Sequence, residues 1–262
     1  MAYTTIDKPS DYFNTITYTG DGTTKTIQGV GFQADLVWGK GRNSDSAHLL
    51  TDSVRGATKT IYSNATSAEV TNSTASLTGF TSDGYTVNSA SNYNVNSRTQ
   101  VNWNWKAGGS ASSNTDGSIT STVSANTTSG FSIVSYTGNG TAGATVGHGL
   151  GVAPKMIIVK KRSGVSTWNV YNEAIGNGKG LYLNTTDATT TYTGFWNDTS
   201  PTSSVFSVGT DNTTNSATYI AYCFADVKGY SKFGSYTGNG NADGTFVYTG
   251  FKPAFIMVKN TE

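Results

Sequence analysis

Short runs of alternating apolar and polar residues, separated by turn-forming clusters, dominate the chain. In "VNWNW" the side chains of Val101, Trp103 and Trp105 fall on one side of an extended strand, and the two asparagines fall on the other. Clusters such as "SDG", "NTTSG" and "NDTSP" separate similar runs that are rich in Thr, Val, Ile and Tyr. This pattern predicts an all-β protein in which the side that carries Trp103 and Trp105 is a core face.

Two other patterns refine this prediction. The runs "DLVWGK", "KMIIVK" and "AFIMVK" are apolar at consecutive positions, which is typical of a central strand covered on both faces. Helical periodicity is weak throughout. Its best candidate, "SAHLLTDSVRGATK" at residues 46–59, predicts a couple of helical turns at most.

One short motif marks an internal repeat. "YTGDG" at residues 18–22 returns as "YTGNG" at 136–140 and at 236–240, and each copy is followed by one of the apolar runs. In the first two copies the match continues: "KTIYSNAT" pairs with "KGLYLNTT", "TGFTSD" with "TGFWND", and "NSRTQVNWNW" with "NSATYIAYCF". The third copy stops after its first segment. Such a pattern indicates a duplicated fold and the beginning of a third unit.

The repeat defines the expected domains. We predict tandem antiparallel β-sandwiches of a jelly-roll-like kind, with a flexible Gly/Ser-rich linker and a lead-in strand that turns at 126–130 to pair with "FSIVSY". A lone hairpin is marginal in water, so the third unit should pack on the second or add strands to a neighbouring subunit. The predicted boundaries are an N-terminal arm at 1–12, a first sandwich at 13–107, the linker and lead-in strand at 108–130, a second sandwich at 131–230, and a partial third unit of a hairpin and an apolar strand at 231–262.

The repeated motif itself has two interpretations. A Gly-rich loop before a helix can bind phosphate, whereas Asn-Gly and Asp-Gly favour tight hairpin turns. No helical pattern follows any copy, so we predict a hairpin turn that opens each unit. The residues expected at the turns are Asp21 with Gly22, Asn139 with Gly140, and Asn239 with Gly240.

Composition and charge narrow the class of protein. Only 13% of the 262 residues are charged, and the formal net charge is +1, so the chain lacks the basic character of a nucleic-acid-binding protein. The single cysteine, Cys223, rules out an intramolecular disulfide and indicates synthesis in a reducing cytosol. The N-terminus does not have the pattern of a signal peptide, and no apolar run is long enough to cross a membrane. We therefore expect no membrane insertion.

Groups suited to catalysis are few. His48 and His148 occupy non-equivalent positions in the two copies, and Cys223 alternates with core aromatic residues. No serine lies in a Gly-x-Ser-x-Gly elbow, and the spacing of an EF-hand loop is absent. These observations predict a non-enzymatic protein without a cofactor or a metal site. A calcium ion held by loop carbonyls stays open as an alternative.

Five residues stand out as candidates for contact with a glycan or a partner. Trp168 and Trp196 have no aromatic counterpart in the first copy, and Lys160, Lys161 and Arg162 follow an apolar strand. The tryptophans could stack on a sugar or pack against the neighbouring unit. The basic residues could form a rim for acidic glycans or discourage edge-to-edge pairing of strands.

Several longer stretches suggest a family. "DYFNTITYTGDG", "LLTDSVRGATKTI", "DGSITSTVSANTTSGFSIVSYTGNG", "VGHGLGVAPKMIIVKKR" and "SKFGSYTGNGNADGTFVYTGFKPAFIMVKN" together resemble virion-associated structural or tail-fibre-like proteins of tailed phages that infect marine bacteria. The resemblance implies a component of the phage particle, with contact to the host surface as a common role. It implies no catalytic or binding residues, and a tail fibre, a capsid fibre and a head decoration are all compatible with it.

The sequence thus leads to three functional hypotheses. The first is a non-enzymatic virion protein that forms a fibre or surface projection, is made in the host cytoplasm, and assembles as a homotrimer with other virion proteins. The second is a carbohydrate-binding module for host surface polysaccharide, and the third, least favoured, is a glycan-cleaving enzyme.

Overall fold

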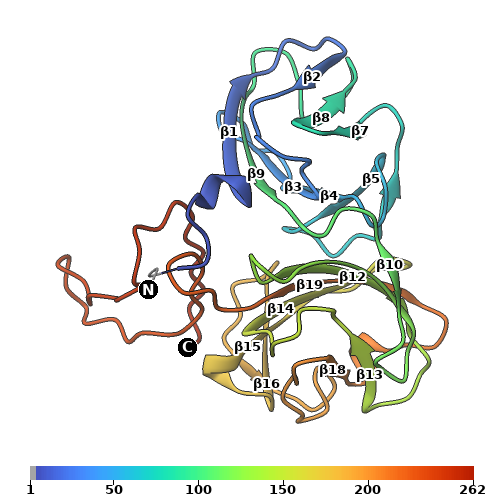
Figure 1. Cartoon of the computed structure of the whole chain (residues 1–262), viewed down its shortest axis with the longest axis vertical. Helices are drawn as coiled ribbons and strands as arrows, with labels where there is room; N and C mark the ends of the chain where they lie inside the picture. The colour runs from blue at the N-terminus through green and yellow to red at the C-terminus, as the bar shows by residue number, and fades with distance from the viewer. Residues whose placement is uncertain (1–3) are drawn as a thin grey trace.

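The computed structural model describes residues 4–262 and is all-β, with every pairing between named strands antiparallel. Figure 1 shows two sheet assemblies, one above the other, with the C-terminal stretch beside them. Residues 13–107 are called the first unit, 131–230 the second unit and 231–262 the C-terminal segment. None of the helices in the described part of the chain is long and apolar enough to cross a membrane.

The first unit is a sandwich of a large and a small sheet. The large sheet has the strand order β1-β9-β3-β4-β5-β6 and the small sheet β2-β8-β7. Their bounds are β1 Phe13–Thr19, β2 Lys25–Ile27, β3 Leu36–Gly41, β4 Leu49–Asp52, β5 Lys59–Tyr62, β6 Val70–Thr71, β7 Leu77–Thr81, β8 Gly84–Val87 and β9 Thr99–Trp105. A 3-10 turn, η1 (Pro9–Asp11), precedes β1.

The second unit has the same order of strands in its large sheet, β12-β19-β14-β15-β16-β17, extended at one edge by β11 and β10, and a small sheet of β13 and β18. The bounds are β10 Ser112–Asn114, β11 Ser121–Asn126, β12 Phe131–Thr137, β13 Ala144–Gly147, β14 Met156–Lys161, β15 Trp168–Asn172, β16 Lys179–Tyr182, β17 Thr190–Thr191, β18 Val205–Val208 and β19 Thr218–Phe224, with 3-10 turns η2 (Glu173–Ile175) and η3 (Thr210–Asn212). The predicted lead-in strand is present, because β11 pairs with β12 along its length. The sheets of each unit are unequal in size, unlike the paired four-stranded sheets of a jelly roll.

The two large sheets face each other and enclose a shared core. Each unit also has its own core, between its large and small sheets. The shared core combines residues of both large sheets: Leu36, Trp38, Leu50, Ile61 and Trp105 from the first unit, and Phe131, Ile133, Met156, Ile158, Trp168, Val170, Leu181, Ile220 and Tyr222 from the second. We call it the inter-unit core.

The two sides of β9 show how the alternation is used. Trp105 belongs to the inter-unit core, and partly buried Trp103 packs against it, so the predicted apolar face is a core face. The asparagine side is also buried, because it points into the first unit. Asn102 donates hydrogen bonds to the hydroxyls of Tyr18 (2.9 Å) and Tyr85 (2.6 Å). A sheet covered on both sides therefore explains why both kinds of residue are buried.

The segment predicted to form a short helix is instead a β-hairpin connection. Leu49 and Leu50 pair with β5, and the backbone then turns. The carboxylate of Asp52 accepts a hydrogen bond from the backbone N–H of Arg55 (2.8 Å), and Gly56 adopts a positive φ of 95°. These features end the strand in a turn, and the helix prediction is wrong because tertiary pairing overrides weak local periodicity.

The repeated Tyr-Thr-Gly motif is a corner between sheets. Strand β1 pairs with β9 whereas β2 pairs with β8, so the motif carries the chain from the large sheet to the small one. The prediction of a hairpin turn is therefore wrong. The predicted turn residues nevertheless share one geometry: Asp21, Asn139 and Asn239 each accept a hydrogen bond from the backbone N–H two residues later. The glycines that follow have φ values of 67–76°, as the turn requires.

The C-terminal segment follows the side of both units without regular structure. Apart from an isolated bridge at Ser231, no strand is formed within 231–262, so the predicted hairpin and apolar strand are not observed. The cause lies in the topology, because β12 and β14 of the second unit do not pair with each other. Each pairs with β19, the last strand of its unit, and the C-terminal segment has no counterpart of that strand.

Candidate functional site

The inter-unit contact carries a buried network of charged side chains beside its apolar core. Asp52 lies at the end of β4, and its carboxylate accepts hydrogen bonds from the guanidinium of Arg55 (2.5 Å) and from the hydroxyl of Tyr222 in the second unit (2.7 Å). Arg55 also donates to the carboxylate of Glu69 (3.1 Å). The charges on Arg55 and Asp52 are fully buried, so each depends on the other for solvation.

Glu69 extends the network to the second unit. Its two carboxylate oxygens accept from the Nε and Nη2 atoms of Arg162, at 2.9 and 3.0 Å. Burial alone would raise the pKa of Glu69, but the hydrogen bonds and charges of Arg162 and Arg55 outweigh it and hold the pKa below its usual value. A bidentate pair of this kind fixes both distance and orientation, which locks the two units in one register.

Most of the residues predicted to contact a glycan are inside the protein. Trp168, fully buried, donates its indole N–H to the carbonyl oxygens of Tyr62 (2.9 Å) and Ala65 (3.2 Å) in the first unit. It therefore packs against the neighbouring unit, which was the other interpretation of this residue. Trp196 is 1% exposed and belongs to the core of the second unit. Neither tryptophan is available for stacking on a sugar.

Two of the three basic candidates, Lys160 and Arg162, make contacts between the two units. Lys160 is buried and donates to the carbonyl oxygens of Thr66 (3.0 Å) and Ser166 (2.7 Å), so it crosses from one unit to the other. Burial lowers its pKa to about 8, with the charge of Lys161 as a second cause. Arg162 is paired with a carboxylate, and Lys161 remains half-buried at the surface. Both interpretations of the basic residues, a rim for acidic glycans and a charged strand edge, require exposure, and neither applies to buried Lys160.

The two histidines and the cysteine differ in environment. His148 is buried, and its Nδ1 accepts from the backbone N–H of Leu150 (3.2 Å), which leaves the hydrogen on Nε2 to be donated to the carbonyl of Thr202 (3.2 Å). Burial lowers the pKa of His148 and of half-buried His48, so both favour the neutral form. Burial raises the pKa of the Cys223 thiol to about 12.

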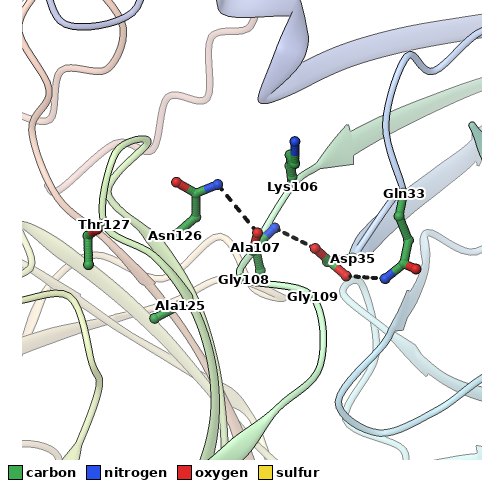
Figure 2. A pocket seen from close by; sticks show the side chains of 9 residues that line it. All are labelled: Gln33, Asp35, Lys106, Ala107, Gly108, Gly109, Ala125, Asn126 and Thr127. Carbon is green, nitrogen blue, oxygen red and sulfur yellow. Dashed lines mark hydrogen bonds between the residues drawn. The ribbon is translucent and has the colours of Figure 1, made fainter. Parts of the chain in front are cut away.

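A cavity of about 450 Å³ lies where the chain passes from the first unit to the second (Figure 2). Its polar groups bind one another: the buried carboxylate of Asp35 accepts from the backbone N–H of Ala107 (2.8 Å), whose carbonyl accepts from the amide of Asn126 (3.3 Å). The next backbone N–H, of Gly108, donates to the hydroxyl of Ser124 (3.0 Å). The predicted flexible start of the linker is thus anchored by hydrogen bonds.

The C-terminal segment presents the largest group of exposed apolar side chains. On its inner side, Phe255 packs against the inter-unit core, with ring centroids 5.8 Å from Phe13 and 5.5 Å from Trp105. Phe233 contacts Phe224 at 5.9 Å. The outer side chains are in solvent: Tyr236, Phe246, Val247, Tyr248, Ile256, Met257 and Val258.

In the sequence, only the incomplete third repeat pointed to this exposed group of side chains. Hydrogen bonds hold the end of the segment against the second unit, where the carbonyl of Thr261 accepts from both the backbone N–H and the hydroxyl of Thr189 (3.1 Å each). Lys259 donates to the carbonyl of Thr185 (2.7 Å). The segment therefore packs on the second unit, as expected, and on the first as well.

Fold and surface together define a class: an all-β protein of two sandwiches joined face to face, with a third, exposed segment attached to the joint. A family described as "Domain of unknown function (DUF7483)" matches residues 8–262, so the chain belongs to that family. Neither a curated protein nor a solved structure matches the chain. The family match runs through both units and the C-terminal segment.

Proposed function

We propose that this protein is a non-enzymatic structural component of a bacteriophage particle, where it forms a fibre or surface projection and contacts the host surface. Its motifs resemble those of virion-associated proteins of tailed phages, as described above. Its two units are held together by a shared apolar core and a buried charge network. A part that transmits force between a particle and a cell needs such a rigid joint.

The inter-unit core is the observation that carries this proposal. Both units bury the equivalent face of their large sheet, so the joint closes on itself and gives a rigid two-unit block. Phe233 and Phe255 already attach the C-terminal segment to the same core. A rigid block of this kind supports a structural role for the protein, and symmetric association of several copies, as a homotrimer, would complete a fibre.

The structure gives less support to the carbohydrate-binding alternative. Trp168 and Trp196, the aromatic residues proposed to stack on sugars, lie in cores, and Lys160 bonds backbone carbonyls. Contact with host polysaccharide would have to involve other residues, so we do not propose it as the primary role.

Labelling of purified particles tests the proposal. Antibodies against the recombinant protein should decorate fibres or projections of the encoding phage in electron micrographs, and the protein should be present in the particle in a fixed number of copies. Sedimentation of the recombinant protein tests the trimer separately. Particles that lack the protein, although infected cells contain it, would overturn the structural role.

A further inference from the structure

Three asparagines of the chain are followed directly by glycine: Asn139, Asn177 and Asn239. Such a pair is chemically labile, because the backbone nitrogen of the glycine can attack the side-chain amide of the asparagine and no glycine side chain hinders the approach. Asn139 and Asn239 lie in identical copies of "YTGNG". A difference in reactivity between these two copies would therefore come mainly from their surroundings in the folded protein.

The pair at Asn139 is held by the loop that precedes β19. The N–H of Gly140 donates to the carbonyl oxygen of Thr213 (2.6 Å), so the attacking nitrogen is already engaged. The Oδ1 atom of Asn139 accepts from the hydroxyl of buried Thr213 (3.1 Å) and from the backbone N–H of Thr141 (2.9 Å). Attack at Asn139 thus requires the corner to open locally first.

The pair at Asn239 forms the same turn without this loop. Its Oδ1 accepts from the backbone N–H of Asn241 (3.0 Å), and its Nδ2 donates to the carbonyl oxygen of Asp243 (2.9 Å). Both contacts lie in an exposed stretch. Among residues 4–262, none accepts a hydrogen bond from the N–H of Gly240. The attacking nitrogen is therefore unengaged at this copy.

The space around the two glycines differs in the same sense. A Cβ on Gly140 would lie 3.1 Å from the Cβ of Asn215, whereas nothing lies within 4 Å of the corresponding position at Gly240. The backbone of the turn is similar, because the two glycines have φ values of 76° and 67°. In each turn the hydrogen bond to Oδ1 closes a small ring that contains the glycine nitrogen, which holds the side-chain amide near it.

We infer that Asn239 is a site of spontaneous deamidation, and that the fold protects Asn139 in the same motif. The backbone nitrogen of Gly240 bonds to Cγ of Asn239 and gives its proton to water. The bond between Cγ and Nδ2 breaks, and the amide nitrogen leaves as ammonia with a proton from water, so a cyclic imide remains. Water then opens the imide at either carbonyl and yields aspartate or isoaspartate at position 239.

The first copy of the motif shows how the aspartate product fits. Asp21 occupies this position there, and its carboxylate accepts from the backbone N–H of Thr23 (2.9 Å), as Asn239 accepts from Asn241. Aspartate therefore keeps the turn, and the added carboxylate lowers the formal net charge from +1 to zero. Isoaspartate instead lengthens the backbone by one atom and changes the turn. Either product alters the C-terminal segment as the protein ages.

Asn177 is the third pair and has a different environment. Its Nδ2 donates to the carbonyl oxygen of Asp198 (2.9 Å) and to the hydroxyl of Ser200 (3.1 Å), so a neighbouring loop holds its side-chain amide. The asparagine is also half-buried, unlike Asn239. We expect Asn177 to react more slowly than Asn239.

Peptide mapping of the full chain by mass spectrometry tests the inference. The folded protein is incubated in mildly alkaline buffer made with heavy-oxygen water, so that the oxygen taken up on hydrolysis marks conversion during the incubation. We expect Asn239 to convert at least about tenfold faster than Asn139, because the hydrogen bonds around Asn139 must open first. In urea the two rates should become similar, because the five-residue motif is identical in both copies.

A matched pair of variants identifies the reacting residue. Asn239→Gln should abolish the acidic species that appears on isoelectric focusing, because the longer side chain forms the corresponding imide much more slowly. Asn177→Gln, at another Asn-Gly pair, should leave that species in place. Equal rates at Asn139 and Asn239 in the folded chain would overturn the inference, as would conversion of Asn239 in urea alone. An acidic species that persists in Asn239→Gln would do the same. The inference rests on the two turns and on no assumption about a phage particle.

Discussion

Replacement of Trp168 by alanine separates a structural role from a sugar-binding role. The indole is fully buried between the units and donates to two carbonyl oxygens of the first unit. Truncation of a buried tryptophan typically costs about 3–5 kcal/mol of unfolding free energy. For a chain of this size, each kcal/mol corresponds to about 2–4 °C in melting temperature. The variant should therefore melt roughly 6–20 °C below the wild type.

A more conservative substitution separates the contribution of the hydrogen bonds from that of the apolar contact. Trp168→Phe keeps much of the apolar contact but leaves the two carbonyl oxygens without their donor, which should cost about 1–3 kcal/mol. Urea unfolding followed by far-ultraviolet circular dichroism measures both variants without relying on tryptophan fluorescence. Val165→Ala, at a solvent-exposed position, should stay within about 0.5 kcal/mol of the wild type. Wild-type stability in Trp168→Ala would refute the assignment of this residue to the inter-unit core.

Three further predictions follow from local geometry. Gly138→Ala should cost about 1–3 kcal/mol because its Cβ would lie 2.5 Å from the carbonyl oxygen of Thr214, whereas Gly238→Ala, with nothing within 4 Å of its Cβ, should melt with the wild type; equal effects of the two substitutions would contradict these different surroundings. Arg162 and Arg55 lower the pKa of Glu69 in the folded state. The ionised carboxylate therefore contributes its full share to the free energy of unfolding above the ordinary carboxyl pKa, and this share is lost as the pH falls through the folded-state pKa. Urea titrations from about pH 5 to 3 should therefore show a smaller loss in Glu69→Gln than in the wild type, and identical slopes would argue against the ion pair. The Cys223 thiol, whose pKa is about 12, should resist thiol reagents until urea unfolds the chain, and rapid labelling of the native protein would contradict its burial.

The sequence predicts individual strands better than it predicts which layer packs against each face of a strand. The lead-in strand and the alternation in β9 are predicted from local patterns, and the structure has both. The comparison of the two copies predicts related units, and their large sheets share one strand order. Alternation identifies two faces of a strand but not the layer that lies against each. The asparagine face of β9 is buried against the small sheet, where the hydroxyls of Tyr18, in the adjacent strand β1, and of Tyr85, in the small sheet, accept the amide hydrogens of Asn102.

The charged network was missed because its partners are remote in sequence. Arg55 and Tyr222 are 167 positions apart, and only the packing of the two large sheets brings them together. A comparison of the two copies nevertheless points to Asp52. Asp52 lies opposite Leu36 in the first unit, and in the second unit the position opposite Met156 is Asn172. Here the charge that is present in one copy and absent from the other takes part in a contact between the units, through the hydroxyl of Tyr222.

The repeated motif shows the opposite case, where local chemistry was correct and its context was wrong. The side-chain turn and the positive φ of Gly22 are fixed by neighbouring residues, so the sequence predicts them. Whether the two flanking strands then pair with each other depends on a strand roughly 80 residues later in the chain, β9. No local pattern carries that information.

Scanning calorimetry of the full chain tests the central claim most directly, namely that the two units form one body through the inter-unit core. We predict a single unfolding transition whose calorimetric and van't Hoff enthalpies agree, and which moves as a whole to lower temperature in Trp168→Ala. Two separate transitions, with only one of them shifted by that substitution, would contradict the account.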